Sequence, residues 1–177
     1  MTQAPVDVAT TRGYQPPVNT QFSVFLDNRV GRLMDLLEVF DQSSQLTLAG
    51  LSVIDSADHA VVRLLTSSGD LARRLLNRNE HCFSEIEVIA IELPYANSLL
   101  TVTETLMSVE LNIHYCYPLL VRPRGLPVVA LHTDDVVFAG QHLRKRHFTV
   151  LAENDLGDNA PGSLPGPPDS PTDPSGI

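Results

Sequence analysis

The residues best suited to bind a small molecule lie in one short stretch, Asp27 to Leu33, which follows an alternating apolar run. Gly31 stands where a helical pattern begins, and its missing Cβ allows close approach to the backbone. Free backbone N–H groups at a helix start attract carboxylates. The Asn28 amide offers a donor and an acceptor, which suits the carboxylate and ammonium of a free amino acid. The same residues also fit a plain turn, in which Asn28 bonds its own backbone.

The residues that could support catalysis or metal binding lack the neighbouring groups that those roles need. Cys82 follows His81, but no orienting acid or oxyanion donor accompanies the thiol. His114 and Cys116 share a strand face, and two residues do not make a metal site. Asp134-Asp135 is interpreted as a helix start. We therefore expect no catalytic residue, no metal, no cofactor and no enzymatic activity.

Spacing predicts the elements that position the Asp27 to Leu33 stretch. Alternation predicts a strand from Phe22 to Leu26, and apolar residues at i, i+3, i+4 and i+7 from Leu33 predict a helix. Ala49-Gly50 is a predicted bulge in the next strand, and Thr66 to Ser68 are predicted to cap the second helix. The remaining predicted elements of this unit are strands over 46–53, 60–65 and 83–93 and a helix over 69–79.

The same order, strand-helix-strand-strand-helix-strand, returns between Val88 and Glu153 at an offset of about 66 residues. The two copies share the residues around 88–93. We predict an α+β fold of two ferredoxin-like βαββαβ units side by side, with the helices on one face of an antiparallel sheet of eight strands. The second copy contains a turn at 94–97, a helix over 99–109, strands over 113–121, 126–133 and 148–151, a hairpin connection at 122–125 and a helix from Asp134 or Asp135 to about Arg146.

Composition sets the predicted domain limits. The ends are rich in proline and polar residues and have no apolar periodicity, so they cannot bury enough surface to order themselves. The prediction is a disordered segment at 1–19, a first domain at 20–90, a second domain at 91–154 and a disordered Pro/Gly-rich tail at 155–177.

Charge and composition exclude several partners. A net charge of −9 in 177 residues is unsuited to nucleic acid, which needs a basic surface. No stretch approaches 18 apolar residues, and no targeting segment precedes the first unit, so no membrane contact is predicted. Two cysteines at different places in the repeat indicate reduced thiols, and we expect a cytoplasmic protein.

The stretch Phe25 to Leu33 resembles the first loop of ACT domains: a strand, an acid or Asn, two variable positions, Gly, and a helix starting with Leu. It is especially similar to the regulatory small subunit of acetohydroxyacid synthase, which carries Leu-Glu-Asn-x-x-Gly-x-Leu there. The likeness extends to Gly50-Leu51-Ser52-Val53. The whole of 22–153 resembles small bacterial proteins made of two ACT domains, and Ile113 to Tyr117 resembles their Tyr-x-Tyr strand.

The resemblance implies an amino-acid effector held at a domain interface. It assigns Asn28 and Gly31 as ligand contacts, beside Asp27 and the backbone of Val30 and Arg32.

Three further positions depart from the family pattern. Thr47 stands where the synthase regulators carry a second Asn, which affects affinity or ligand identity. In the second loop Pro94 replaces Asn28 and Asn97 replaces Gly31. Asn97 is expected to keep a left-handed turn, and either Tyr115 supplies other contacts or the second site is degenerate.

We expect a non-catalytic, allosteric regulatory protein that binds a small amino acid and acts on an enzyme of amino-acid metabolism. The alternatives are a regulatory subunit of acetohydroxyacid synthase and a structural module with degenerate sites. The strand from Ile113 places Tyr115 and Tyr117 on a sheet face with little charge to solvate it. This predicts a homodimer, in which a second copy covers that face or an edge.

Overall fold

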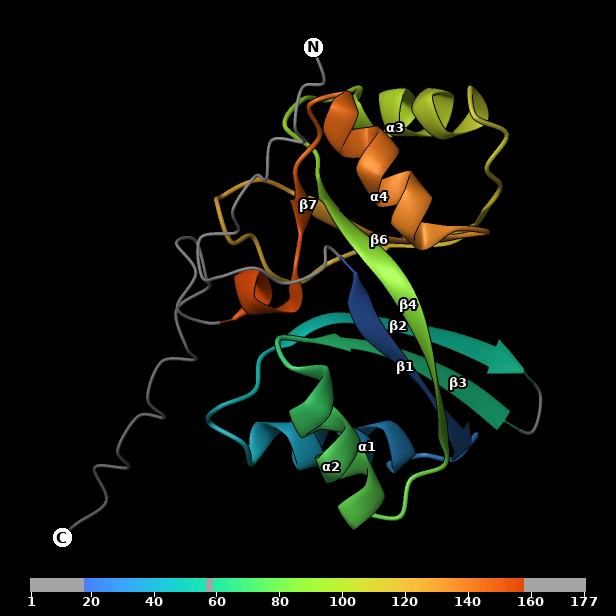
Figure 1. The fold of residues 1–177 in the computed structure, drawn as a ribbon. Helices are drawn as coiled ribbons and strands as arrows, with labels where there is room; N and C mark the ends of the chain where they lie inside the picture. The colour runs from blue at the N-terminus through green and yellow to red at the C-terminus, as the bar shows by residue number, and fades with distance from the viewer. Residues whose placement is uncertain (1–17, 57–58, 158–177) are drawn as a thin grey trace, which may run out of the picture.

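The computed structural model describes residues 18–56 and 59–157. Its described strands form one antiparallel sheet of seven strands in the order β2-β3-β1-β4-β6-β5, with β7 beside β4 (Figure 1). The predicted disorder at both ends falls largely outside the described residues and stays a prediction. The elements are β1 (Asn19–Asp27), α1 (Arg32–Asp41), β2 (Leu48–Ser56), β3 (His59–Thr66), α2 (Gly69–Arg78), β4 (Phe83–Glu92), α3 (Ser98–Met107), β5 (Ile113–Pro118), β6 (Val128–Thr133), α4 (Val136–Lys145), β7 (Val150–Leu151) and the 3-10 helix η1 (Glu153–Leu156).

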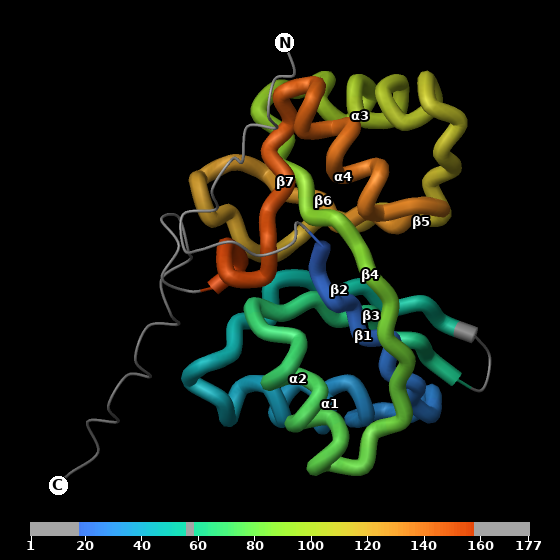
Figure 2. Tube along the Cα trace, in the orientation of Figure 1, coloured from blue at the N-terminus to red at the C-terminus, as the bar shows by residue number. Residues whose placement is uncertain are grey.

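Strand β4 belongs to both units. Its first part, Phe83 to Val88, pairs with β1, and its second part pairs with β6 on one side and β7 on the other. Each unit therefore has the ferredoxin-like strand order, with β4 last in the first unit and first in the second (Figure 2). The predicted sharing is confirmed. The expectation of eight strands is wrong, because one strand serves twice.

All four α-helices of the described chain lie on one face of this continuous sheet, as predicted. Along β4, Phe83 packs against the core under α1 and α2, while Ile89 and Ile91 point from the same face into the core under α3 and α4. The sheet bends between the units, so the two helix pairs lie at opposite ends of the molecule (Figure 1). No described helix is long and apolar enough to cross a membrane.

The helix-free faces of the two units pack against each other. This seam contains Val88 and Ala90 of β4 together with Leu65 and Tyr117. At the predicted bulge, Gly50 permits the contact: a Cβ there would lie 2.5 Å from Leu119 Cδ2. The close approach predicted for this glycine is confirmed.

The seam removes the reason given for a homodimer. Tyr117 is only 7% exposed, because the second unit folds its helix-free face onto that of the first. Tyr115 is half-buried beside it. The expectation that these tyrosines lie on an open sheet face is wrong, and dimerisation itself stays a prediction.

Candidate functional site

The turn between β1 and α1 is built around Gly31. Its φ is 92° and its ψ is −24°, a left-handed conformation that side chains with a Cβ adopt at a cost. The Arg29 N–H donates to the Asp27 carbonyl at 2.8 Å, and the Arg32 N–H donates to the Arg29 carbonyl at 3.2 Å. A Cβ on Gly31 would meet no heavy atom within 4 Å, so the backbone angle, and not crowding, requires the glycine. The turn leaves the start of α1 open.

The helices that open the two units lack a side-chain cap. No side chain of the described chain caps α1 at Gly31 or α3 at Asn97. In contrast, Ser68 caps α2 and Asp135 caps α4, as predicted. An uncapped helix start presents backbone N–H groups without intrahelical acceptors, which is the arrangement that accepts a carboxylate.

Two residues that the sequence did not point to lie near this turn. Asn28 Nδ2 donates to Asp55 Oδ1 at 2.7 Å, because the end of β2 reaches the end of β1 through β3. His81 follows α2 and lies near Arg32, and burial, with Arg32 adding to it, lowers the pKa of His81. His81 is therefore neutral at pH 7. The register of three neighbouring strands, which was not worked out from the sequence, is the signal that could have found Asp55.

The structure brings together five of the eight candidate residues: Asp27, Asn28, Val30, Gly31 and Arg32, all of them exposed in one turn. Thr47 lies elsewhere. The pairing of Asp27 with His59, and of Leu48 with Thr66, places Thr47 about 30 Å along the strands from Asn28.

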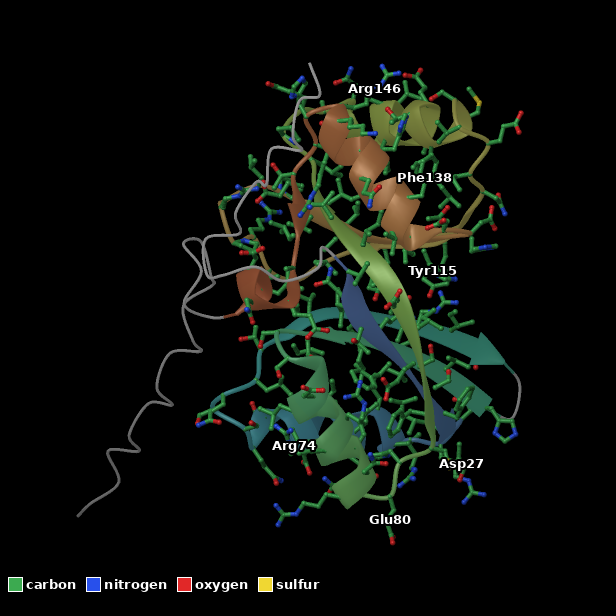
Figure 3. All side chains as sticks on the ribbon, in the orientation of Figure 1. Asp27, Arg74, Glu80, Tyr115, Phe138 and Arg146 are labelled. Atoms are coloured by element: carbon green, nitrogen blue, oxygen red, sulfur yellow. The ribbon has the colours of Figure 1, made fainter. Side chains whose placement is uncertain are left out.

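Asn97 and Tyr115 are also remote from the first turn. Asn97 follows the opposite end of the ten-residue strand β4, about 30 Å away. Tyr115 contacts Gln21 in the seam, about 20 Å along β1 from Asp27. Figure 3 shows Asp27 at the far end of the first unit and Tyr115 between the units. Within one chain these residues cannot form one pocket.

The second turn has a different construction. Asn97 has φ −96° and ψ 6°, so the expected left-handed turn is wrong. Instead, Ser98 Oγ accepts a hydrogen bond from the Tyr95 N–H at 2.8 Å, and the Ser98 N–H donates to the Tyr95 carbonyl at 3.0 Å. A serine-stabilised turn therefore replaces the glycine turn.

A chain of hydrogen bonds crosses the seam. The Tyr117 hydroxyl donates to Gln21 Oε1 at 2.9 Å, and Gln21 Nε2 donates to the Tyr115 hydroxyl at 2.9 Å. Burial raises the pKa of both tyrosines, so both hydroxyls remain protonated at neutral pH. The Arg63 guanidinium lies over the Tyr115 ring, with Cζ 3.7 Å from its centroid.

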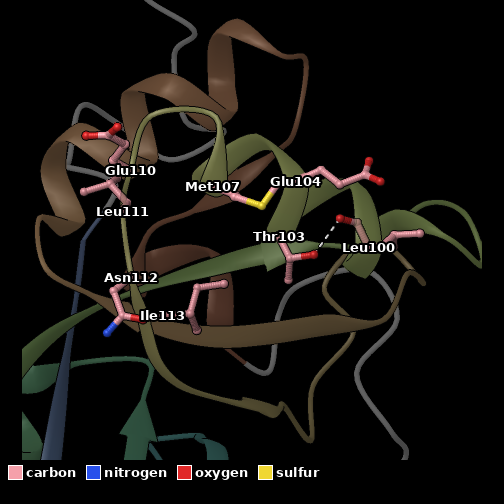
Figure 4. A pocket seen from close by; sticks show the side chains of 8 residues that line it. All are labelled: Leu100, Thr103, Glu104, Met107, Glu110, Leu111, Asn112 and Ile113. Carbon is pink, nitrogen blue, oxygen red and sulfur yellow. Dashed lines mark hydrogen bonds between the residues drawn. The ribbon is translucent and has the colours of Figure 1, made fainter.

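A groove on the outside of α3 offers another surface, but its charge is unsuited to an amino-acid carboxylate (Figure 4). Its charged side chains are Glu104 and Glu110, and no basic residue lines it. Both carboxylates would repel a third one. The groove is lined by Leu100, Thr103, Glu104, Met107, Glu110, Leu111, Asn112 and Ile113.

The fold agrees with that of known proteins. The sequence profile of the ACT domain pair matches residues 18–159, and the chain belongs to this family. BT0572 from Bacteroides thetaiotaomicron is 25% identical, with a TM-score of 0.70 over 78% of this chain and 95% of that one. The regulatory subunit of aspartate kinase from Thermus thermophilus is 11% identical, with a TM-score of 0.51 over 73% of this chain and 91% of that one, and shows the fold alone. No curated protein sequence is significantly similar. The ACT expectation is confirmed, whereas none of these likenesses confirms the closer resemblance to the acetohydroxyacid synthase subunit.

Proposed function

We propose that this protein is a non-catalytic regulator that binds one small free amino acid at the turn from Asn28 to Gly31. The observation that carries the proposal is the uncapped start of α1 behind a left-handed glycine, in a chain of the ACT domain pair family. The N–H groups of the first turn of α1 and the Asn28 amide receive the carboxylate. Asp55, whose carboxylate lies 2.7 Å from Asn28 Nδ2, and Asp27, which precedes Asn28 in the chain, are the acids available to receive the ammonium.

The second turn binds no effector in this proposal. Its backbone is not left-handed, and Ser98 already bonds the Tyr95 N–H within the turn. Pro94 has no amide side chain to replace that of Asn28. Each chain therefore has one effector site.

A second copy of the chain closes the effector site. Val30 is fully exposed and Met34 is 60% exposed beside the turn, which leaves apolar surface for a partner. Arg32 and Asp35 stand together on the same surface, 3.2 Å apart. In a two-fold pair, the cation of one copy faces the carboxylate of the other, so this surface is self-complementary. Effector binding then favours one arrangement of the two copies, and an enzyme of amino-acid metabolism responds to that arrangement.

A thermal-shift screen of the full chain against free amino acids at ~10 mM tests the proposal. Binding to the folded state alone adds about 2.7 kcal/mol when the ligand concentration is 100 times Kd. We expect one amino acid, or a few related ones, to raise Tm. Asn28→Ala should abolish the shift, and the matched variant Asn97→Ala in the second turn should keep it. No shift with any amino acid, or equal shifts in both variants, would overturn the proposal.

A further inference from the structure

Arg63 is a half-buried cation at the edge of the seam. Its guanidinium stacks on Tyr115, and none of the ion pairs among residues 18–56 and 59–157 includes it. Arg73, on α2, is in contrast paired with carboxylates, since it binds both Asp70 and Glu85. Guanidinium N–H groups lie in the plane of the group, so stacking on a ring leaves them available.

Three serines extend the polar surface around Arg63. Arg63 lies on β3, between β2 and β1. Ser52 of β2 and Ser23 of β1 stand directly opposite it, and Ser84 of β4 stands directly opposite Ser23. Residues directly opposite each other on adjacent strands project from the same face of the sheet. Four strands therefore place three hydroxyls and one guanidinium in a single row.

An apolar row follows two residues further along the strands. Ile54, Val61 and Phe25 are directly paired across β2, β3 and β1. Phe25 is 49% exposed and Ile54 is 39% exposed, so this row is accessible. It lies about 7 Å from the polar row, a distance that a chain of about five carbons spans.

The guanidinium is held in place from the other unit. Tyr117 orients Gln21, and Gln21 orients Tyr115, through the two hydrogen bonds that cross the seam. The Tyr115 ring then supports Arg63. A site whose cation is positioned before the ligand arrives loses less entropy on binding.

We propose that Arg63 and its row of serines form a second binding site, for a small monocarboxylate that has an apolar tail and no ammonium group. The carboxylate takes two N–H groups of Arg63, a geometry that arginine favours. The tail covers Phe25, Val61 and Ile54. This site is separate from the Asn28 turn and does not depend on it.

The row of Arg63 has no acid of its own, which disfavours an ammonium group there. It consists of one guanidinium and the hydroxyls of Ser52, Ser23 and Ser84. On the facing unit, His132 stacks against Tyr115 with centroids 5.3 Å apart, and Asp134 is already bound to His114 Nε2 at 2.8 Å and to the Asn112 N–H at 2.9 Å. An ammonium beside Arg63 would therefore meet a cation, with no carboxylate in the row to balance it.

Two probes of one carbon skeleton test this site: 4-methylpentanoate, and leucine, which differs from it by the ammonium group. The chain contains no Trp and four Tyr, so tyrosine emission is not masked by tryptophan, and Tyr115 is one of its four sources. We expect 4-methylpentanoate to change the emission of the full chain saturably at millimolar concentration. Acetate, which lacks the tail, should bind about tenfold more weakly.

Variants separate this site from the effector turn. Arg63→Met and Arg63→Lys should each weaken 4-methylpentanoate binding about tenfold or more, because lysine keeps the charge and loses the bidentate geometry. The matched control Arg74→Met changes an exposed arginine of α2, labelled in Figure 3, and should bind as the wild type does. Asn28→Ala should also leave this binding unchanged, whatever its effect on amino acids. The proposal fails if wild-type emission does not saturate with 4-methylpentanoate, if leucine binds equally well in Asn28→Ala, or if Arg63→Lys, checked as folded by circular dichroism, binds as tightly as the wild type.

Discussion

Replacing Arg124 with Met should destabilise the protein strongly, because it unpairs a buried carboxylate. Glu92 ends β4 with its side chain 3% exposed, and Arg124 binds both of its oxygens, at 2.8 and 2.5 Å. The same contact raises the pKa of Arg124. Without the arginine, the buried carboxylate has lost its partner.

The expected loss is about 3 kcal/mol at pH 7, the lower end of the cost of unpairing a buried charge, because Arg124 itself is half exposed. Urea unfolding followed by circular dichroism, with variant and wild type compared, measures this value. Arg122→Met, an exposed arginine in the same connection, should change stability by less than about 0.5 kcal/mol. The double variant Glu92→Leu/Arg124→Met removes both charges and should recover most of the loss. A double variant no more stable than Arg124→Met would show that lost packing, and not the unpaired charge, causes the loss.

Three further predictions concern the contacts between the units. Tyr117→Phe leaves Gln21 Oε1 without its donor and should cost about 1–3 kcal/mol in urea unfolding, whereas Tyr95→Phe, at an exposed site, should cost little. Burial raises the pKa of Tyr117, so the buried neutral phenol contributes its full stabilisation below about pH 10, and this contribution falls as the pH rises further. Tyr117→Phe should therefore lose less stability than the wild type at alkaline pH. Glu153→Ala removes the acceptor of the Thr20 and Gly69 N–H groups, each bound at 2.8 Å, and should lower stability by about 2 kcal/mol. Glu38→Ala, at an exposed site, is the control. Equal stability of the two variants would contradict a stabilising role for these two hydrogen bonds.

Local signals in the sequence predicted most of the elements. Apolar spacing placed the helices and strands, and turn chemistry placed the caps at Ser68 and Asp135 and the bulge at Gly50. The overlap of the two copies at β4 followed from the repeat itself. These features depend on residues close together in the chain, so periodicity and capping rules are sufficient to find them.

Contacts between distant residues were not predictable in the same way. Alternation shows that Tyr115 and Tyr117 share a face, but it does not show what lies opposite. Here the bend of the sheet brings Gln21, 94 residues from Tyr115, across the seam. Similarly, η1 lies at the start of the predicted disordered tail, yet Glu153 binds the N–H of Thr20, 133 residues away.

The candidate site was predicted only in part. The turn at Gly31 was predicted from the space that a missing Cβ leaves, whereas its left-handed backbone is what requires the glycine. The left-handed turn expected at Asn97 is wrong, because the hydrogen bond from the Tyr95 N–H to Ser98 Oγ sets the turn there. Asp55 reaches Asn28 through the pairing of three strands. Thr47 was assigned by likeness to relatives, and the register places it at the other end of the sheet.

Amide chemical-shift mapping by NMR tests the central claim most directly. The ¹⁵N-labelled full chain would be titrated with the amino acid that gives the largest thermal shift. We predict that the amides of Gly31 and Leu33, at the uncapped start of α1, move most at saturation, while those of Asn97 and Ser98 move little. Largest shifts at the second turn or along the row of Arg63, with Gly31 unmoved, would contradict the assignment of the effector to the first turn.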